Sequence, residues 1–282
     1  MRSIPWNAIA RLAREGLQED IGPGDVTSQA LVVAGARARG VILAQEPLVA
    51  AGLEPARLCF LWLDRQARFP VLRDAGDRLA AGEPLLIVEG SARAILMAER
   101  TALNFLARLS GIATAARRCV DALQDLDCEV YATRKTTPGW RWLEKDAVAA
   151  GGAQPHRAGL HDAVLIKDNH LVVGGGVTSC VHAARSAYGT GMVIEVEVES
   201  IEQLEEALEA GADVILLDNM PVPVMAEAAR RVRGRAVLEA SGGITPDTLR
   251  AVASTGVQRI SLGALTHSSP AASLSLVLEP LA

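Results

Sequence analysis

The second half of the chain alternates short apolar runs with helical segments, and this alternation constrains the fold more than any other feature of the sequence. The runs have the length and composition of strands, and apolar residues recur at helical spacing between them, for example over 201–210, 222–232 and 246–254. The six runs lie at 129–132, 163–166, 192–198, 214–217, 236–238 and 259–262. This order predicts a parallel sheet, either closed as a barrel or open.

Polar or glycine residues stand at or directly after the end of each run. They are Arg134 and Lys135, Lys167, Glu197, Asp218, Ser241 with Gly242 and Gly243, and Gly263. In a (β/α) barrel all strand carboxyl ends face one mouth, whereas a doubly wound sheet collects ligands at one switch point. Groups at all six ends therefore favour an incomplete TIM-like barrel, with fewer strands than eight.

The first third of the chain reads as a separate α+β unit. Helical spacing over 6–17 is followed by a turn-rich stretch over 19–27, by strands at 39–50 and 83–89, and by a long helix over 92–109 that ends before Gly111. With 282 residues and half of them hydrophobic, the chain has room for two domains. The expected division is an N-terminal domain over 1–110 and a barrel over 111–268.

Composition excludes several classes of protein. The net charge of −5 and a pI near 5.6 argue against nucleic acid as the main partner. No eighteen-residue apolar run and no basic start followed by an apolar stretch occur, so neither a membrane span nor an export segment is expected. The four cysteines are scattered and lack metal or redox spacing, which predicts reduced thiols in a cytoplasmic protein.

A dense group of cationic and imidazole side chains lies between residues 133 and 170. Its members are Arg134, Lys135, Arg141, Lys145, His156, Arg157 and Lys167. An acidic chain does not need such a group for solubility, so we expect it to hold an anion. The alternative is a solvated basic face, but these residues alternate with Thr, Gly and Pro rather than following helical spacing.

Small residues after the fifth run predict a phosphate site. Ser241, Gly242 and Gly243 precede a helix that starts near Pro246, so bare backbone amides and the positive end of the helix face the same place. Gly263 after the next run can complete this cup. Glycines at such junctions also serve as plain tight turns, and that alternative stays open.

Carboxylates and one histidine are the remaining candidate site residues. One strand face carries three acids, Glu195, Glu197 and Glu199. Glu197 and Asp218 together form a candidate Mg²⁺ site. The other two glutamates more readily pair with a nearby Arg or Lys. His156 adjoins Arg157 in a glycine-rich loop and joins the anion site; the remaining histidines, His161, His182 and His267, are treated as structural. Together these groups fit a phosphorylated sugar and a carboxylated partner.

The sequence resembles the quinolinate phosphoribosyltransferase family nearly from end to end. The resemblance is carried by ordered motifs at residues 19–27, 99–104, 110–114, 133–139, 156–157, 166–170, 195–198, 217–219, 239–244 and 261–263. It implies an N-terminal α/β sandwich, an incomplete α/β barrel, and a tail over 269–282 that packs back on the first domain. It also implies a homodimer with shared active sites, or a larger assembly of such dimers.

The activity implied by the resemblance is transfer of ribose 5-phosphate from phosphoribosyl pyrophosphate to the ring nitrogen of quinolinate. The products would be nicotinate mononucleotide, pyrophosphate and CO₂, in de novo NAD biosynthesis. Positive charge that develops on the ribose would be stabilised by Glu197 or Asp218, directly or through Mg²⁺, while lysines hold the leaving diphosphate. No protein nucleophile is required.

Residue roles follow position by position from the resemblance. Quinolinate would be bound by Arg134, His156, Arg157 and Lys167, with Arg100 supplied by the partner subunit, although Arg100 read by itself is equally a member of a local pair with Glu99. Phosphoribosyl pyrophosphate would be bound by Lys135, Ser241, Gly242, Gly243 and Gly263. The metal would be bound by Glu197 and Asp218. The catalytic residues would be Lys135, Lys167, Glu197 and Asp218. Gln154 and Pro155 depart from the family pattern of glycine and asparagine, which affects the expected path of that loop.

Two alternative functions are weighed against this one. The first is a paralogous phosphoribosyltransferase-like protein of the kind found with molybdate transport, and the intact stretches 136–139 and 167–170 argue against it. The second is a non-catalytic nucleotide sensor that keeps the phosphate cup. Retention of both Glu197 and Asp218 argues against a sensor, because binding alone does not require the acids on the metal side.

Overall fold

The computed structural model describes residues 6–281 of the chain. Residues 1–5, on which the expectation of no export segment partly depends, and residue 282 lie outside the described residues. The chain divides into two compact units. Unit 1 runs to Arg117 and includes Trp142–Gly152 and the segment from Ser269 onward, whereas unit 2 comprises Arg118–Arg141 and Ala153–Ser268.

Unit 1 is built on a four-stranded antiparallel sheet in the order β12-β1-β5-β3. These strands are β1 (Arg37–Ala44), β3 (Arg68–Leu72), β5 (Pro84–Ser91) and β12 (Leu274–Leu281). The predicted single strand over 39–50 is in fact two, because β2 (Leu48–Val49) leaves this sheet and pairs with β4 (Arg78–Leu79). Buried and more accessible residues alternate along β1, as expected for a sheet with one face in the core.

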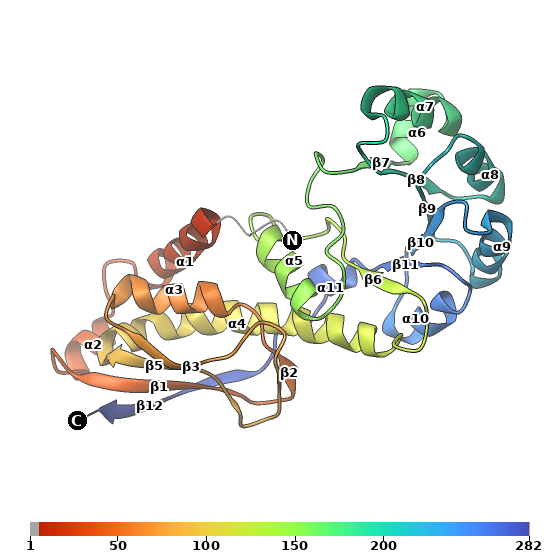
Figure 1. Cartoon of the computed structure of the whole chain (residues 1–282). Helices are drawn as coiled ribbons and strands as arrows, with labels where there is room; N and C mark the ends of the chain where they lie inside the picture. The colour runs from red at the N-terminus through yellow and green to blue at the C-terminus, as the bar shows by residue number, and fades with distance from the viewer. Residues whose placement is uncertain (1–5, 282) are drawn as a thin grey trace. The chain divides into compact units, whose positions relative to one another are not determined.

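Helices cover one face of this sheet, which gives the α/β sandwich that the resemblance implied. Figure 1 shows α3 and the first part of α4 lying over the strands. The helices of unit 1 are α1 (Trp6–Ile21), α2 (Val26–Leu31), α3 (Leu53–Leu63), α4 (Ala92–Asp121) and α5 (Arg141–Ala150). The start of α2 is set by Asp25, whose carboxylate accepts hydrogen bonds from the N–H groups of Thr27 and Ser28 at 3.0 and 2.9 Å.

Helix α4 continues well past its predicted end at residue 109, because Gly111 does not terminate it. A Cβ atom on Gly111 would lie 2.0 Å from the carbonyl oxygen of Pro270, so this glycine permits the C-terminal segment to cross the helix closely. The expected domain boundary between 110 and 111 therefore falls inside a continuous helix. The α5 segment also belongs to unit 1, where Glu144 forms an ion pair with Arg108 at 3.0 Å.

The C-terminal segment completes the sheet of unit 1. Strand β12 pairs along the whole of β1, from Arg37 opposite Leu281 to Ala44 opposite Leu274. Because β12 is the edge strand next to β1, residues from the two ends of the chain form one sheet.

Unit 2 contains the six-stranded parallel sheet, in the order β6-β11-β10-β9-β8-β7. The strands are β6 (Glu129–Tyr131), β7 (Val164–Ile166), β8 (Ile194–Val198), β9 (Val214–Asp218), β10 (Val237–Ser241) and β11 (Arg259–Ser261). The helices are α6 (Asp168–Gly174), α7 (Val177–Tyr188), α8 (Ile201–Glu209), α9 (Val222–Val232), α10 (Pro246–Ala253) and α11 (Ala264–His267). Figure 1 shows the sheet curving, with α7 to α10 along its outer side. The α/β fold class is confirmed.

The barrel is incomplete between β6 and β7, which form the two edges of the sheet in the described part of the chain. On the β6 side, Gln154 extends the edge: its N–H donates to the carbonyl of Val130 and its carbonyl accepts from Ala132, both at 2.8 Å. The chain then runs through His156 and Arg157 toward β7. Among residues 6–281, no helix combines the length and the apolar character needed to cross a bilayer.

Candidate active site at the mouth of the incomplete barrel

A cavity of about 730 Å³ opens at the carboxyl ends of the strands of unit 2. All six strand ends contribute to it, as the sequence predicted from the polar groups that follow the apolar runs. Its lining includes Arg134, Lys135, His156, Arg157, Lys167, Glu197, Asp218, Ser241, Gly242, Gly243 and Gly263. The structure thus brings the proposed site residues of the barrel together.

Three cations from the sequence analysis lie elsewhere. Arg100 is exposed on α4 in unit 1 and is not among the lining residues. Lys145 is buried in unit 1, with 3% of its surface exposed, so its assignment to the cationic group was wrong. Arg141 has protein partners, the hydroxyl of Thr136 at 3.0 Å and the carbonyl of Ala158 at 3.3 Å. Spacing along the chain did not separate these residues from those at the mouth.

Two arginines at the mouth leave donors without a protein acceptor. The Nε atom of Arg134 is buried and has no hydrogen-bond partner among the described residues. Within the described part of the chain, the guanidinium group of Arg157 has one hydrogen bond, a long one to the carbonyl of Ala163 at 3.5 Å. Burial, and then the charge of Arg134, lower the pKa of Arg157. Two partly buried guanidinium groups that repel each other make a site for an anion with more than one acceptor oxygen.

Lys167 and Glu197 face each other across neighbouring strand ends. Lys167 directly precedes α6, and its N–H donates to the Nδ1 atom of His170 at 2.9 Å. Its Nζ atom lies 2.5 Å from Oε2 of Glu197, whose side chain is only 12% exposed. The structure therefore pairs a lysine assigned to the diacid with a glutamate assigned to the metal.

The glycine-rich turn after β10 adopts a backbone conformation that suits glycine. Gly242 and Gly243 have φ values of 92° and 61°, and a Cβ atom on Gly242 would lie 2.2 Å from Oδ1 of Asn219. Asn219 also takes a positive φ of 52°, and its N–H donates to the carbonyl of Ser241 at 2.9 Å. This close packing keeps the turn next to the end of β9.

A histidine that was treated as structural lines the cavity. His267 lies in the one-turn helix α11, four residues after Gly263. A Cβ atom on Gly263 would meet Nε2 of His267 and Cδ of Lys135, each at 3.0 Å. Gly263, whose φ is not positive, therefore leaves space for these two side chains. The available signal was the position of His267 one helical turn after a strand-end glycine.

A second layer of polar residues lies beneath the mouth, and the sequence analysis largely missed it. Nε2 of His156 lies 3.5 Å from Glu195 and 3.3 Å from Glu239, and the hydroxyl of Ser261 donates to Glu239. The expectation that Glu195 pairs with Arg or Lys is corrected, because its close partner is a histidine. The alternation of Glu239 with Ser241 along β10 was the signal that these two residues share a face.

The protonation of this layer follows from its acids. Burial lowers the pKa of His156, but hydrogen bonds to Glu195 and Glu239, together with their charges, outweigh it and raise that pKa to about 9. Burial raises the pKa of Glu195. The N–H of Arg157 donates to Nδ1 of His156 at 2.7 Å. Because Nδ1 accepts this hydrogen bond, the ring proton is on Nε2, and the additional proton that the raised pKa represents is shared by the ring and the two acids rather than held on Nδ1.

The mouth offers two carboxylates to a cation. Glu197 uses Oε2 for Lys167 and Asp218 uses Oδ2 for the side-chain amide of Asn219, which leaves the second oxygen of each. Two carboxylates that line one cavity suit a divalent cation such as Mg²⁺. The group of three metal-ligating side chains found among the described residues is a different one, namely His156, Glu195 and Glu239.

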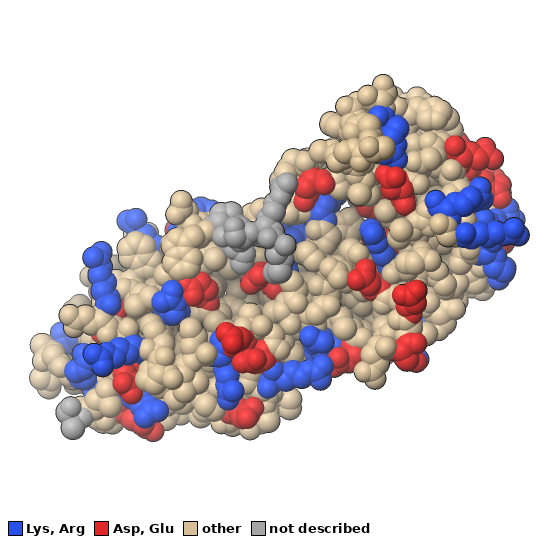
Figure 2. Space-filling model, viewed as in Figure 1, with Lys and Arg blue, Asp and Glu red and all other residues tan. Residues whose placement is uncertain are grey.

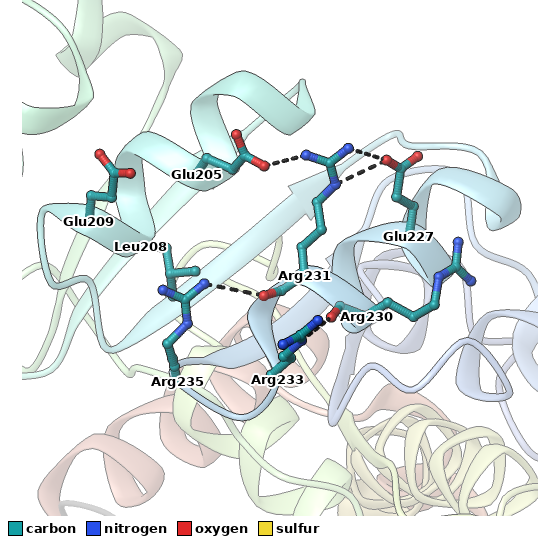
Figure 3. Close-up of a pocket in the computed structure, with 8 residues that line it drawn as sticks. All are labelled: Glu205, Leu208, Glu209, Glu227, Arg230, Arg231, Arg233 and Arg235. Atoms are coloured by element: carbon teal, nitrogen blue, oxygen red, sulfur yellow. Dashed lines mark hydrogen bonds and ion pairs between the residues drawn. The ribbon is translucent and has the colours of Figure 1, made fainter.

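A second hollow of about 860 Å³ lies on the outer surface of unit 2, beside α8 and α9. It is lined by Glu205, Leu208, Glu209, Glu227, Arg230, Arg231, Arg233 and Arg235. Figure 2 shows basic side chains gathered over this region, and those that line the hollow are arginines. Figure 3 shows that Arg231 lies between Glu205 and Glu227 and that Arg235 donates to a backbone carbonyl at 3.2 Å. Arg231 is therefore paired with two acids, and Arg233 and Arg235 with backbone carbonyls.

Comparison with known proteins identifies the family. The model for the N-terminal domain of quinolinate phosphoribosyl transferase matches residues 25–110, and the model for its C-terminal domain matches residues 112–277. The chain belongs to the quinolinate phosphoribosyltransferase family. The family that the sequence predicted is confirmed.

Relatives within the quinolinate phosphoribosyltransferase family are similar over nearly their whole length. The probable nicotinate-nucleotide pyrophosphorylase (carboxylating) of Bacillus subtilis is 42% identical over 95% of this chain and 92% of its own. The Rattus norvegicus enzyme of that name is 39% identical over 98% and 92%. The crystal structure of NadC from Streptococcus pyogenes superposes with a TM-score of 0.94 at 36% identity and covers 100% of both chains.

A more distant structure shares the fold alone. Human nicotinic acid phosphoribosyltransferase superposes with a TM-score of 0.58 at 13% identity, over 95% of this chain and 74% of its own. The names of the closer relatives favour a catalytic phosphoribosyltransferase over a molybdate-transport paralogue or a nucleotide sensor.

Proposed function

We propose that this protein transfers ribose 5-phosphate from phosphoribosyl pyrophosphate to quinolinate, with loss of CO₂, in the biosynthesis of NAD. The products are nicotinate mononucleotide and pyrophosphate. The observation that carries the proposal is the cavity at the barrel mouth, where unsatisfied guanidinium groups, two carboxylates and a glycine turn lie together. Relatives named as nicotinate-nucleotide pyrophosphorylases support it.

Quinolinate binds at the cationic end of the cavity. Arg134 and Arg157 supply forked donors for its two carboxylates, and Lys167 and His156 complete the set. The unpartnered Nε of Arg134 gains an acceptor when the diacid is bound. Binding also relieves the repulsion between Arg134 and Arg157.

Phosphoribosyl pyrophosphate binds at the opposite end. Lys135, Ser241, Gly242, Gly243 and Gly263 form its phosphate side, and His267, which the sequence analysis left out, joins them. The positive φ values of the two adjacent glycines allow main-chain N–H groups to approach phosphate oxygens without an intervening side chain.

The bond changes need charge stabilisation rather than a nucleophile from the protein. The bond between ribose C1 and pyrophosphate breaks as the ring nitrogen attacks C1, and Glu197 and Asp218 stabilise the positive charge on the sugar. Lys135 and Lys167 hold the departing negative charge. The carboxylate next to the now cationic nitrogen then leaves as CO₂, and a proton from solvent takes its place on the ring.

The same two acids are the residues that would hold Mg²⁺. Glu197 and Asp218 each keep one carboxylate oxygen for a cation. When bound, Mg²⁺ neutralises charge on the diphosphate and orients it.

The working form is proposed to be a cytoplasmic homodimer that shares its active sites. Arg100 is exposed on unit 1, and the apolar side chains of Leu160, Val172 and Val173, which flank β7 in unit 2, are exposed by 75%, 83% and 90%. A second copy of the chain would cover such residues and bring its Arg100 to the diacid. The four free cysteines fit a reducing compartment.

A single assay tests the reaction. The full-length protein is incubated with quinolinate, phosphoribosyl pyrophosphate and Mg²⁺, and the products are separated by chromatography. We expect nicotinate mononucleotide and pyrophosphate in equal amounts and no product when quinolinate is left out. Absence of nicotinate mononucleotide from folded protein would refute the proposed function.

Complementation between subunits tests the shared site. Arg100→Ala and Lys167→Ala chains are each expected to be inactive as homodimers. Mixed dimers should regain part of the activity, because one of their two sites has both residues. Mixed dimers that are confirmed by tagged co-purification and remain inactive would exclude borrowing of Arg100.

A further inference from the structure

Two buried carboxylates lie directly beneath the mouth of the barrel. Glu195 precedes Glu197 by two residues on β8, and Glu239 precedes Ser241 by two on β10, so each lies on the same face as a mouth residue and one layer deeper. Their side chains are 4% and 0% exposed. One oxygen of each carboxylate has no hydrogen-bond partner among the described residues.

His156 lies between these acids and is their shared partner. Its Nε2 atom is 3.3 Å from Oε1 of Glu239 and 3.5 Å from Oε2 of Glu195, and its side chain is 12% exposed. Two buried acids this close are stable together only when a proton or cation lies between them. The contacts of Nε2 with the two acids therefore fix the position of the imidazole. The Tyr131 ring packs edge-on against it, with 5.9 Å between the two ring centroids.

The other side of the imidazole holds the main chain at the diacid end. The N–H of Arg157 donates to Nδ1 of His156 at 2.7 Å, and His156 has a φ of 54°, a conformation that costs a residue with a side chain free energy. A residue is kept in such a conformation only where its surroundings enforce it. Here the enforcing contacts are those to the two acids.

We propose that Glu239, acting through His156, is a positioning residue that holds the main chain at Arg157 in the conformation that receives the diacid. This inference rests on the proposed function. Glu239 is better suited to this role than Glu195, because the Ser261 hydroxyl fixes its Oε1 atom and because it lines the cavity. The connection runs from Ser261 through Glu239 and His156 to the main chain at Arg157.

The first test is a KM comparison on the full-length enzyme. Glu239→Gln keeps the shape of the side chain and removes its charge, so the anchor of His156 weakens. The KM for quinolinate should rise about 10- to 100-fold, the range for loss of a charged hydrogen bond. The KM for phosphoribosyl pyrophosphate should stay within about threefold, because its side of the cavity does not depend on His156.

A diacid that cannot react separates binding from chemistry. Phthalate has the same two adjacent carboxylates but no ring nitrogen, and its inhibition constant should rise in parallel with the KM for quinolinate. Equal losses for both substrates, or an unchanged phthalate constant, would overturn the inference. If Glu239→Gln does not fold, Ser261→Ala is used instead, with an expected loss of about 3- to 10-fold on the diacid side alone.

A double-mutant cycle tests whether Glu239 acts through His156. In a His156→Ala background, Glu239→Gln should change the KM for quinolinate by less than about threefold, because the residue that it positions is gone. Fully additive effects would overturn the proposed route. Glu227→Gln, which removes an exposed acid of the surface hollow, is the matched control for charge and should leave both KM values unchanged.

The outcomes separate this inference from the proposed function. Wild-type protein that makes no nicotinate mononucleotide refutes the function. Wild-type protein that makes it while Glu239→Gln has the same KM for quinolinate refutes only the positioning role. A metal ion that is retained by the wild type and lost from Glu239→Gln, measured by elemental analysis, would also refute it, because His156 would then be a metal ligand.

Discussion

The mouth of the barrel and the hollow beside α8 and α9 are both large and rich in arginine, but they differ in what their charges contact. In the hollow, Arg231 lies between two glutamates and its neighbours donate to backbone carbonyls. At the mouth, the buried Nε atom of Arg134 has no acceptor within residues 6–281. In the larger hollow, Arg231, Arg233 and Arg235 thus already contact protein acceptors, whereas the smaller cavity is the candidate binding site. An unsatisfied buried donor that lies in a cavity at the strand ends, rather than the density of positive charge, distinguishes the mouth from the hollow.

The largest effect is expected for substrate selectivity, which tests whether the arginines at the mouth require a ligand. Nicotinate lacks one carboxylate of quinolinate and would leave a buried guanidinium without an acceptor. We expect its kcat/KM to be lower by roughly 10⁴ or more. Parallel assays with the two acids at saturating phosphoribosyl pyrophosphate measure this ratio, and similar values would show that the mouth does not require both carboxylates.

Removing the unsatisfied arginine should have the next largest effect. Arg134→Ala should lower kcat/KM for quinolinate by about 100- to 1000-fold, the cost of deleting one side of a buried charge pair. The melting temperature should stay constant or rise, because Arg157 loses a repulsive neighbour. A clear fall in melting temperature with little loss of activity would mean that Arg134 is structural.

A pair of glycine variants compares the backbone of the two regions. Gly242→Ala at the mouth should raise the KM for phosphoribosyl pyrophosphate about 10- to 100-fold, because its Cβ would lie 2.2 Å from Asn219. Gly234→Ala, next to the hollow, has a similar φ of 75° but nothing within 4 Å of the new atom. It should lose about 1 kcal/mol of stability and no activity. Equal kinetic effects would contradict this distinction.

The buried layer at the mouth should make stability depend on pH. The pKa of His156 is raised to about 9 from its ordinary value of 6.5, so the stabilising contribution of the proton that it shares with Glu195 and Glu239 is complete below about pH 6.5 and is lost as the pH rises through 9. We expect wild-type protein to lose on the order of 2 kcal/mol of unfolding free energy over this range, beyond the loss in His156→Ala. Denaturant titrations at several pH values measure the difference, and parallel curves would contradict it.

The smallest effect is expected in the hollow. Arg231→Ala removes two exposed ion pairs, which should cost less than about 1 kcal/mol and leave both KM values unchanged. The loss should shrink further in high salt. A large kinetic effect of this variant would show that the hollow has a role in function.

The sequence predicted the barrel mouth well because the positions that determine it are local. A polar residue at the end of an apolar strand, such as Lys167 or Asp218, reaches the mouth of a parallel barrel wherever the rest of the chain lies. Side-chain alternation likewise placed Glu195 and Glu197 on one face. These inferences need only the period of a strand and the common direction of parallel strands.

Features that depend on a distant contact were missed. Gly111 reads as a helix terminator, and only the close approach of Pro270 explains why a glycine lies inside this helix. His267 carries no local mark of its closeness to Lys135, and the partners of Glu239 lie on other strands or in a loop. Arg100 depends on a second chain, so its role stays a prediction.

The pairing of β1 with β12 has a consequence for synthesis on the ribosome. Gln45 and Ser275 are hydrogen-bonded although they are 230 positions apart, so the first sheet lacks an edge strand until almost the whole polypeptide has been translated. The strands of the parallel sheet, by contrast, all lie between these partners in the sequence, from β6 to β11. Nascent chains stalled before β12 should therefore expose an unpaired strand, and chaperones that recognise extended segments should bind there.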